Sequence, residues 1–265
     1  MIVVDGKKIA GEIISGLKKQ PTPRKELAAI LVGGNAASAS FLRQKEKIAK
    51  DLGVSFRLYN PGSALSESEL IAELSKIIGN EQVGGFILQL PLPEKYDRDQ
   101  VLAALPPEKD VDNLTGKASV PPPAVAAVRT ILHTTDYSLP DKVVGVVGRG
   151  LLVGRPVAEW LSGKCREVII FHTKTDLSRI ADCDLVICGA GKAGLIKPEM
   201  LKSGAGVIDF GFDLVDGKIS GDFDTSKLIN LSTHHLAFYT PTPGGTGPIL
   251  VAELFKNFYN VVLVE

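Results

Sequence analysis

The feature that most restricts how this chain folds is the alternation of short apolar runs with amphipathic stretches of helical length. The first apolar runs are ELAAILVG (26–33), VSFRLY (54–59) and GGFILQL (84–90), and helical periodicity covers the segments around 38–52 and 66–78. Ser66 and Glu69 have the spacing of a capping box at the start of the second helix. Strand–helix alternation predicts a mainly parallel sheet covered on both faces.

A second series of buried-strand patterns begins after Lys142. Its members are VVGVVG (143–148), REVIIFH (166–172), DLVICGAG (184–191) and GAGVIDFG (204–211). LVDGKI (214–219) carries an Asp-Gly turn signal between extended pieces, and a final helix is expected near 249–260. The two series predict an α/β protein with two lobes of similar size and a cleft between them.

Composition restricts the class of ligand and the compartment. Lys+Arg and Asp+Glu both number 30, so the chain has no net charge that would attract nucleic acid or an anionic membrane. No apolar stretch approaches the roughly 18 residues of a membrane span. Three cysteines without C-x-x-C spacing argue against disulfides and zinc, and His234-His235 lacks acids or cysteines at ligand spacing. The first residues place charge inside a short apolar run, unlike a signal peptide. We expect a cytoplasmic, metal-free globular protein.

The glycine-rich turn VVGVVGRGLLVGRP (143–156) resembles a dinucleotide-binding fingerprint, but with one residue too many. Gly148, Gly150 and Gly154 give G-x-G-x-x-x-G in place of G-x-G-x-x-G. The turn follows a strand pattern and opens a helix whose first turn contains Pro156, so free N–H groups there could hold a diphosphate. A tight turn without a ligand is the alternative, but the strand before the turn, the helix after it and the series of strand patterns that follows favour a nucleotide site.

The end of the next strand favours NADP over NAD. NAD-specific folds usually place an acid there for the ribose 2′-hydroxyl, but FHTKT (171–175) has no acid before Asp176. Thr173, Lys174 and Arg149 could instead hold a 2′-phosphate through charge-assisted contacts. The alternative is an exposed basic loop with no ligand.

The first lobe holds three polar candidates. Lys45 shares a helix face with Phe41, four residues earlier, although most helical lysines are only solvated. Gln89 ends an otherwise apolar strand, where α/β sheets place ligands. Asp110 and Asp112 lie in a loop, where acids often cap turns, and nothing local decides between the two interpretations.

Seven ordered motifs resemble those of the bifunctional methylenetetrahydrofolate dehydrogenase/methenyltetrahydrofolate cyclohydrolases (FolD type), over nearly the full length. They read S-F-L-R-Q-K-E-K, G-F-I-L-Q-L-P-L-P, K-D-V-D-N, G-R-G-L-L-V-G-R-P, H-T-K-T, V-I-D-F-G and P-T-P-G-G-T-G-P. The long glycine turn is this family's own spacing. The resemblance implies a catalytic, folate-binding domain over 1–118, completed by 247–265, a Rossmann-like NAD(P)-binding domain over 119–246, and a homodimer formed through the nucleotide lobe.

The resemblance also implies roles for individual residues. Lys45 would move protons, chiefly in the cyclohydrolase step, with support from Gln89, and Asp112 would hold the pterin ring. Arg149 and Thr173 would contact the 2′-phosphate, and Gly244-Gly245 would lie beside nicotinamide and folate. The implied catalytic residues are Lys45, Gln89 and Asp112; the implied substrate-binding residues are Phe41, Gln89, Leu90, Pro91, Asp112, Pro243, Gly244 and Gly245. The implied cofactor-binding residues are Gly148, Arg149, Gly150, Val153, Gly154, His172, Thr173, Lys174, Gly191, Gly211 and Thr246.

The implied activity is NADP-dependent oxidation of 5,10-methylenetetrahydrofolate followed by hydrolysis to 10-formyltetrahydrofolate. Phe41 replaces the family tyrosine, which removes a hydroxyl beside Lys45, and Gly150 replaces the serine of G-R-S. One alternative is therefore a dehydrogenase with weak or no cyclohydrolase activity. Another, from a different class, is a folate- or nucleotide-binding protein without catalysis.

Overall fold

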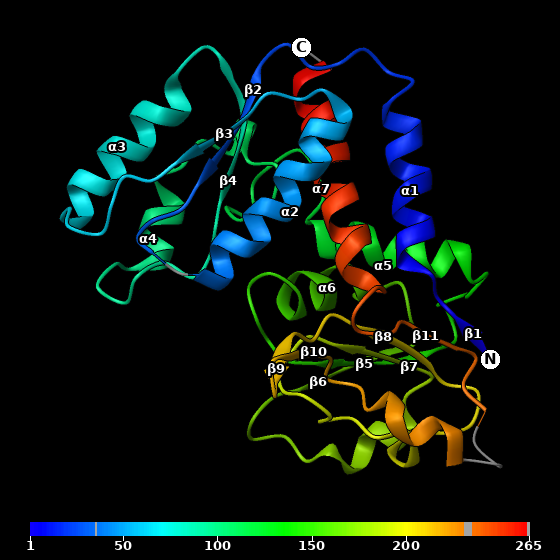
Figure 1. Cartoon of the computed structure of the whole chain (residues 1–265). Coiled ribbons are helices and arrows are strands. Elements are labelled where there is room, and N and C mark those ends of the chain that lie inside the picture. Colours follow the sequence, from blue (N-terminus) through cyan, green and yellow to red (C-terminus); the bar gives the residue numbers. More distant parts are fainter. Residues whose placement is uncertain (35, 231–234, 264–265) are drawn as a thin grey trace. The chain divides into compact units, whose positions relative to one another are not determined.

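The computed structural model describes residues 1–34, 36–230 and 235–263 (Figure 1). The chain divides into two compact units, Met1–Ala10 with Ala124–Leu250 and Gly11–Pro123 with Val251–Glu265. We call them the six-stranded unit and the three-stranded unit after their main sheets. The two-domain α/β class expected from the sequence is confirmed, and both main sheets are parallel.

The three-stranded sheet has the order β3-β2-β4, and its strands match the first series of apolar runs. Its strands are β2 (Glu26–Ile30), β3 (Phe56–Tyr59) and β4 (Val83–Leu88), and β2 pairs in parallel with both neighbours. β4 is buried along its whole length, which explains its continuous apolar sequence. Because β3 and β4 lie on opposite sides of β2, right-handed crossovers put α2 (Ala36–Leu52) and α3 (Glu67–Gly79) on opposite faces of the sheet (Figure 1).

The helix α3 begins as its sequence predicts. The Ser66 hydroxyl accepts a hydrogen bond from the Glu69 backbone N–H, and the Glu69 carboxylate accepts one from the Ser66 backbone N–H at 2.8 Å. Leu70, Leu74 and Ile78, spaced by four residues, are fully buried. The cap sets the first turn, and this apolar face fixes the helix on the sheet.

The six-stranded sheet has the order β1-β11-β8-β7-β5-β6, and all its pairs are parallel. Its strands are β1 (Ile2–Val3), β5 (Val143–Val147), β6 (Glu167–Phe171), β7 (Leu185–Cys188), β8 (Gly206–Asp209) and β11 (Phe238–Tyr239). The chain passes from β5 to β6 on one side and continues with β7 on the other, so β5 and β7 flank the switch point of the sheet. Buried side chains such as Phe171, Val186 and Val207 form the core beneath it.

The strand β1 gives the first residues a place that sequence periodicity does not reveal. Ile2 and Val3 pair with Phe238 and Tyr239, which attaches Met1–Ala10 to the six-stranded unit. A strand of two residues carries no periodic pattern, and its partner lies far along the chain. Only the folded sheet therefore identifies it.

The predicted Asp-Gly turn is confirmed as a hairpin between β9 (Asp213–Val215) and β10 (Lys218–Ser220). Asp216 and Gly217 have φ of 50° and 74°, the left-handed backbone that a tight two-residue hairpin requires. The remaining helices are α1 (Gly6–Leu17), α4 (Arg98–Ala103), α5 (Pro123–Thr134), α6 (Gly154–Leu161) and α7 (Thr246–Leu263), with short 3₁₀ helices at Pro107–Lys109, Leu177–Asp182, Pro198–Met200 and Thr225–Asn230. None of the helices in the described ranges has the length and hydropathy to span a bilayer.

Candidate functional site

The glycine turn after β5 is closed so tightly that two of its glycines admit no side chain. Gly148 has φ of 97°, and a Cβ built on it would lie 2.6 Å from the carbonyl oxygen of Gly189. A Cβ on Gly154 would lie 2.1 Å from the carbonyl oxygen of Gly148, whereas one on Gly150 would meet nothing within 4 Å. Gly148 and Gly154 are thus required by backbone packing, and α6 begins at Gly154 with its N–H groups facing the turn.

This turn lies at the switch point between β5 and β7, where open parallel sheets bind nucleotides. The loop after β7 carries Gly191, whose φ is 66°. Its shape is set by Asp222, a buried carboxylate that accepts hydrogen bonds from the backbone N–H groups of Ala190 (2.6 Å), Gly191 (3.3 Å) and Lys192 (2.7 Å). Burial raises the pKa of Asp222, and these three bonds oppose that shift. No local sequence pattern around Asp222 predicts this role.

The basic residues predicted to contact a phosphate come together at the carboxyl ends of β5 and β6. Val147 pairs with Phe171, and the Gly148 N–H donates to the Phe171 carbonyl at 2.8 Å, so Arg149 and the segment 172–174 extend from neighbouring strand ends. Arg149, His172, Thr173 and Lys174 are exposed. Neither Arg149 nor Lys174 forms an ion pair with any residue that the structure describes.

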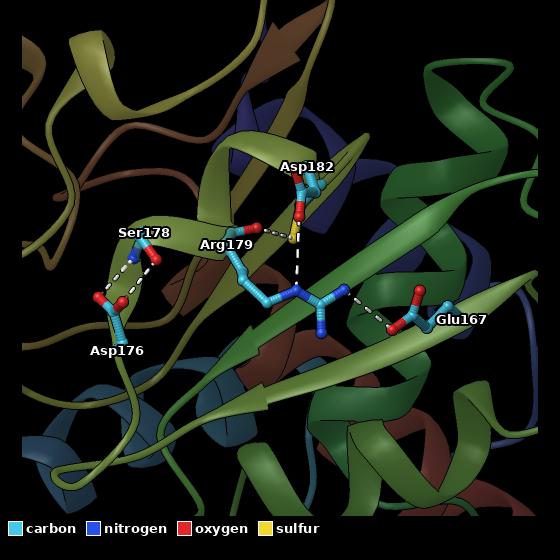
Figure 2. A network of polar contacts seen from close by, with 6 residues as sticks. Glu167, Asp176, Ser178, Arg179 and Asp182 are labelled. Carbon is cyan, nitrogen blue, oxygen red and sulfur yellow. Dashed lines mark hydrogen bonds and ion pairs between the residues drawn. The ribbon is translucent and has the colours of Figure 1, made fainter.

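Asp176, the first acid after β6 in the sequence, caps a 3₁₀ helix. The two carboxylate oxygens of Asp176 accept from the Ser178 backbone N–H at 2.9 Å and from the Ser178 hydroxyl at 2.6 Å, which caps the 3₁₀ helix (Figure 2). In the same view Arg179 bridges Glu167 and Asp182, 3.2 Å and 3.4 Å away. The Arg179–Glu167 ion pair joins the 3₁₀ helix to β6, the Arg179–Asp182 pair lies within the helix, and Asp176 forms its cap.

In the three-stranded unit, Lys45, Gln89 and Asp112 come together from three separate segments. The Lys45 ammonium on α2 lies 3.5 Å from Oε1 of Gln89, the residue that directly follows β4. The Gln89 amide N–H₂ donates to the Leu90 carbonyl at 2.9 Å, which turns Oε1 toward the lysine. Burial raises the pKa of the Asp112 carboxyl, and the positive charge of Lys45 opposes that shift. An ammonium, an amide and a carboxylate therefore form one electrostatically coupled group, the lysine cluster.

The two acids of K-D-V-D have different surroundings. Asp110 is fully buried and accepts from the Thr115 backbone N–H at 2.8 Å, as a turn-forming acid does. Asp112 is half-buried. Between them, the Val111 carbonyl accepts a hydrogen bond from the Asn257 amide at 2.9 Å, and the same amide donates to the Pro121 carbonyl at 2.8 Å. Asn257, buried on α7, thus anchors the loop that carries Asp112, a role with no local sequence signal.

Three of the other predicted substrate residues lie near these groups in sequence, and three lie in the other unit. Phe41 is half-buried one helical turn before Lys45 on α2, Leu90 is half-buried, and Pro91 is exposed after a cis peptide bond. Pro243, Gly244 and Gly245 form a loop in the six-stranded unit, and Gly244 has φ of 102°. Thr246 starts α7, but its hydroxyl donates to the Asp209 carbonyl at 2.7 Å.

The remaining predicted cofactor residues, Val153 and Gly211, shape backbone in the six-stranded unit. A Cβ on Gly189 would lie 2.9 Å from a Val153 methyl, so this side chain packs on the loop after β7. A Cβ on Gly211 would lie 2.4 Å from the Asp222 nitrogen. Both residues support loops around the switch point.

A parallel sheet with a glycine turn at its switch point and basic residues at the next strand end defines a dinucleotide-binding protein. The lysine cluster adds a second polar group suited to proton transfer, which is typical of an enzyme. Family models agree domain by domain: residues 4–112 match the tetrahydrofolate dehydrogenase/cyclohydrolase catalytic domain, and residues 122–265 match its NAD(P)-binding domain. The chain belongs to the tetrahydrofolate dehydrogenase/cyclohydrolase family, as its motifs predicted.

Individual relatives support the same conclusion. The bifunctional protein FolD of Halothermothrix orenii is 34% identical, over 96% of this chain and 95% of its own. The structure of the bifunctional FolD methylenetetrahydrofolate dehydrogenase/cyclohydrolase from Campylobacter jejuni is 30% identical, with a TM-score of 0.91 over 100% of this chain and 99% of that one. The Trypanosoma brucei enzyme, solved with NADP and an inhibitor, is 28% identical, with a TM-score of 0.88 over 99% of this chain and 97% of that one.

Proposed function

We propose that the protein oxidises 5,10-methylenetetrahydrofolate to 5,10-methenyltetrahydrofolate with NADP⁺ and hydrolyses the product to 10-formyltetrahydrofolate, two steps of one-carbon metabolism. The observation that carries the proposal is the lysine cluster of Lys45, Gln89 and Asp112 in a chain that also has a nucleotide turn. Full-length similarity to bifunctional relatives supports both activities. A generic dehydrogenase would need the nucleotide turn but not the lysine cluster.

The first step transfers a hydride from the methylene carbon of the substrate and leaves a methenyl cation shared by two nitrogens. Bound NADP⁺ would supply the hydride acceptor. The residues present fit this cofactor, because Gly148 and Gly154 leave the backbone bare at the turn and α6 begins there. The protein's own contribution is alignment of substrate and ring, which is the main requirement of hydride transfer.

The second step adds water to the methenyl carbon and releases one proton as the five-membered ring opens to the formyl product. We propose that Lys45 moves protons between the attacking water and the ring nitrogen. Gln89 would hold the ammonium in place through its Oε1, and Asp112 would bind the pterin ring through its carboxylate. Asn257 keeps the Asp112 loop in position by its two carbonyl contacts.

NADP, in preference to NAD, is our proposed cofactor. Arg149, Thr173 and Lys174 are exposed at adjacent strand ends, and the two cations have no ion-pair partner among the described residues. Asp176 is the first acid after β6 in the sequence, and its two oxygens accept hydrogen bonds from Ser178. The site therefore offers positive charge for a 2′-phosphate, and the first acid after β6 is used as a helix cap.

Replacing Arg149 by alanine tests this preference. A charge-assisted hydrogen bond is worth about 1.5–3 kcal/mol, which corresponds to roughly a 10- to 100-fold rise in the KM for NADP⁺. The KM for NAD⁺, which has no 2′-phosphate, should stay unchanged. Arg155→Ala is the matched control, because this exposed arginine lies on α6 with a 3.9 Å contact to Glu159. Equal losses for both cofactors would refute the 2′-phosphate role of Arg149.

Phe41 motivates a second candidate, a dehydrogenase with weak or no cyclohydrolase activity. The phenyl ring can stack on a folate but offers no hydroxyl to the ammonium of Lys45. Loss of a polar partner from a buried network costs about 1–3 kcal/mol. A third candidate, a binding protein without catalysis, leaves the retained lysine cluster unexplained.

One assay separates the three candidates. The purified protein is mixed with methylenetetrahydrofolate and either NADP⁺ or NAD⁺, while NADPH or NADH and the methenyl product are followed at separate wavelengths. A bifunctional enzyme forms NADPH without lasting methenyl accumulation. Accumulation of the methenyl product would identify a dehydrogenase alone, and absence of both signals would identify a binding protein.

The remaining features of the proposal concern organisation. We propose a catalytic domain at 1–118 completed by 247–265, a nucleotide domain at 119–246, and a cytoplasmic location. We also propose a homodimer through the nucleotide domain. Large apolar side chains are exposed there on the edge strand β6 and the β9–β10 hairpin: Ile170, Leu214, Val215 and Ile219. Burial of such a patch by a second copy would remove it from water.

A further inference from the structure

The loop Pro241–Thr246, which we call the proline-glycine loop, is held from the end of β8 by one residue, Asp209. The Asp209 backbone N–H donates to the Thr240 hydroxyl at 2.7 Å, and its carbonyl accepts from the Thr246 hydroxyl at 2.7 Å. The Thr242 hydroxyl donates to the Asp209 carboxylate at 3.4 Å. Asp209 therefore contacts the chain before, within and at the end of this loop.

The Asp209 carboxylate also holds the neighbouring turn. It accepts from the backbone N–H groups of Gly211 at 2.7 Å, Phe223 at 3.0 Å and Asp222 at 3.3 Å. The side chain is buried, and a Cβ on Gly221 would lie 2.0 Å from its Oδ2. Both carboxylate oxygens therefore act only as acceptors. The close approach of Gly221 leaves no room for a larger group beside them.

The opposite side of the proline-glycine loop is closed by the first residue of α1. A Cβ on Gly6 would lie 1.6 Å from the Gly245 carbonyl oxygen and 2.7 Å from the Gly244 carbonyl oxygen. The peptide planes of the two glycines therefore rest directly on the backbone of α1. The loop is confined between this helix end and the Asp209 contacts.

We propose that Asp209 is a positioning residue for the dehydrogenase step, which holds the proline-glycine loop in the one conformation that aligns nicotinamide and folate. The proposal rests on the proposed function, for which the family resemblance implies that Gly244 and Gly245 lie beside both reactants. Asp209 does not touch the reacting atoms and acts only through the loop. Hydride transfer is sensitive to misplacement of its reactants by as little as 1 Å.

The ionisation of Asp209 supplies a signature of this role. Burial raises the pKa of Asp209 to about 6, and among the described residues Asp222 and the Cys188 thiol, neither of them a cation, face it. The pKa of Asp209 is higher in the folded protein than in the unfolded chain, so the ionised carboxylate lowers the free energy of unfolding above about pH 6. This loss of stability is reversed as the pH falls and the carboxyl takes up its proton. The local effect on the loop is different. Protonation turns one acceptor oxygen into a donor that faces the N–H groups of Gly211, Asp222 and Phe223, and this weakens the contacts that hold the loop.

The test uses Asp209→Asn and Thr240→Val, with Asp141→Asn in the exposed turn before β5 as the control. Asn places an N–H₂ against backbone donors, whereas Val keeps the shape of Thr240 and removes only the acceptor of the Asp209 N–H. We expect both test variants to lower the dehydrogenase kcat by about tenfold or more, with a smaller change in KM. Hydrolysis of added methenyltetrahydrofolate, which needs no nicotinamide, should persist. Asp141→Asn should match the wild type.

Two further readouts separate positioning from general destabilisation. The wild-type dehydrogenase kcat should fall as the pH drops through about 6, and Asp209→Asn should lose this acid limb. Amide hydrogen exchange of Thr242 and of residues 244–247 should accelerate in both variants, while exchange in β5 stays slow. Unchanged exchange in the loop, or an unchanged kcat in folded Thr240→Val, would overturn the proposal. If the wild type has no dehydrogenase activity, the proposed function fails, and the exchange result alone still shows whether Asp209 holds the loop.

Discussion

Replacing Lys45 by methionine is expected to abolish hydrolysis of methenyltetrahydrofolate while NADPH formation continues. Methionine keeps the length and the apolar stem of the lysine but removes the ammonium that lies 3.5 Å from Gln89 Oε1. A positioned acid or base contributes about 10²- to 10⁴-fold to a rate, so the cyclohydrolase should fall by at least the lower figure. Hydride transfer needs no proton at this position. The two rates are measured at separate wavelengths in one reaction.

The control for this variant lies on the same helix. Lys47→Met changes an exposed lysine of α2 two residues away, and both activities should survive it. Thermal unfolding of both variants shows whether the fold is intact. If folded Lys45→Met loses both activities equally, the lysine serves substrate binding and not proton transfer. If it keeps both, the lysine cluster is not the cyclohydrolase centre.

Replacing Gly154 by alanine is expected to break the nucleotide turn. The added Cβ would lie 2.1 Å from the Gly148 carbonyl oxygen and 2.7 Å from its carbonyl carbon, both of them backbone atoms that cannot rotate away. Overpacking of this kind costs about 1–3 kcal/mol. Alanine would otherwise favour α6 by about 1 kcal/mol over glycine. We expect the steric term to dominate, so that the melting temperature falls and the KM for NADP⁺ rises by about tenfold or more.

Gly150 provides the matched control in the same turn. A Cβ on Gly150 would meet no atom within 4 Å, so Gly150→Ala should leave both stability and NADP⁺ binding close to wild type. Calorimetric titration with NADP⁺ and thermal unfolding measure the two effects. A stabilised Gly154→Ala that binds NADP⁺ normally would show that the tight approach of Gly148 and Gly154 is not needed for the site.

The division of the molecule into units makes these two variants independent. Lys45 belongs to the three-stranded unit and Gly154 to the six-stranded unit. Gly154→Ala should therefore spare hydrolysis of added methenyltetrahydrofolate, just as Lys45→Met spares NADPH formation. Opposite patterns of loss in the two variants would assign the two activities to different groups of residues.

Much of the fold was determined by local sequence. The apolar runs at 84–90 and 143–148 predicted buried parallel strands, because a strand covered on both faces needs apolar side chains throughout. Ser66 and Glu69 predicted the start of α3, and Asp216-Gly217 predicted the hairpin, because caps and tight turns depend on residues only a few positions apart. Family membership followed from the ordered motifs.

The tertiary structure alone decided how distant residues support one another. Asp209 and Asp222 are two acids among thirty Asp and Glu residues in the sequence, and only the fold reveals that they bind the loops at 189–192 and 240–246. Asn257 meets Val111 across 146 residues, and Gly6 meets Gly245 across nearly the whole chain. Such contacts depend on the closing of long loops around a sheet. Local propensity and residue spacing do not predict which distant segments come into contact. The roles of these residues could therefore be identified only from the folded chain.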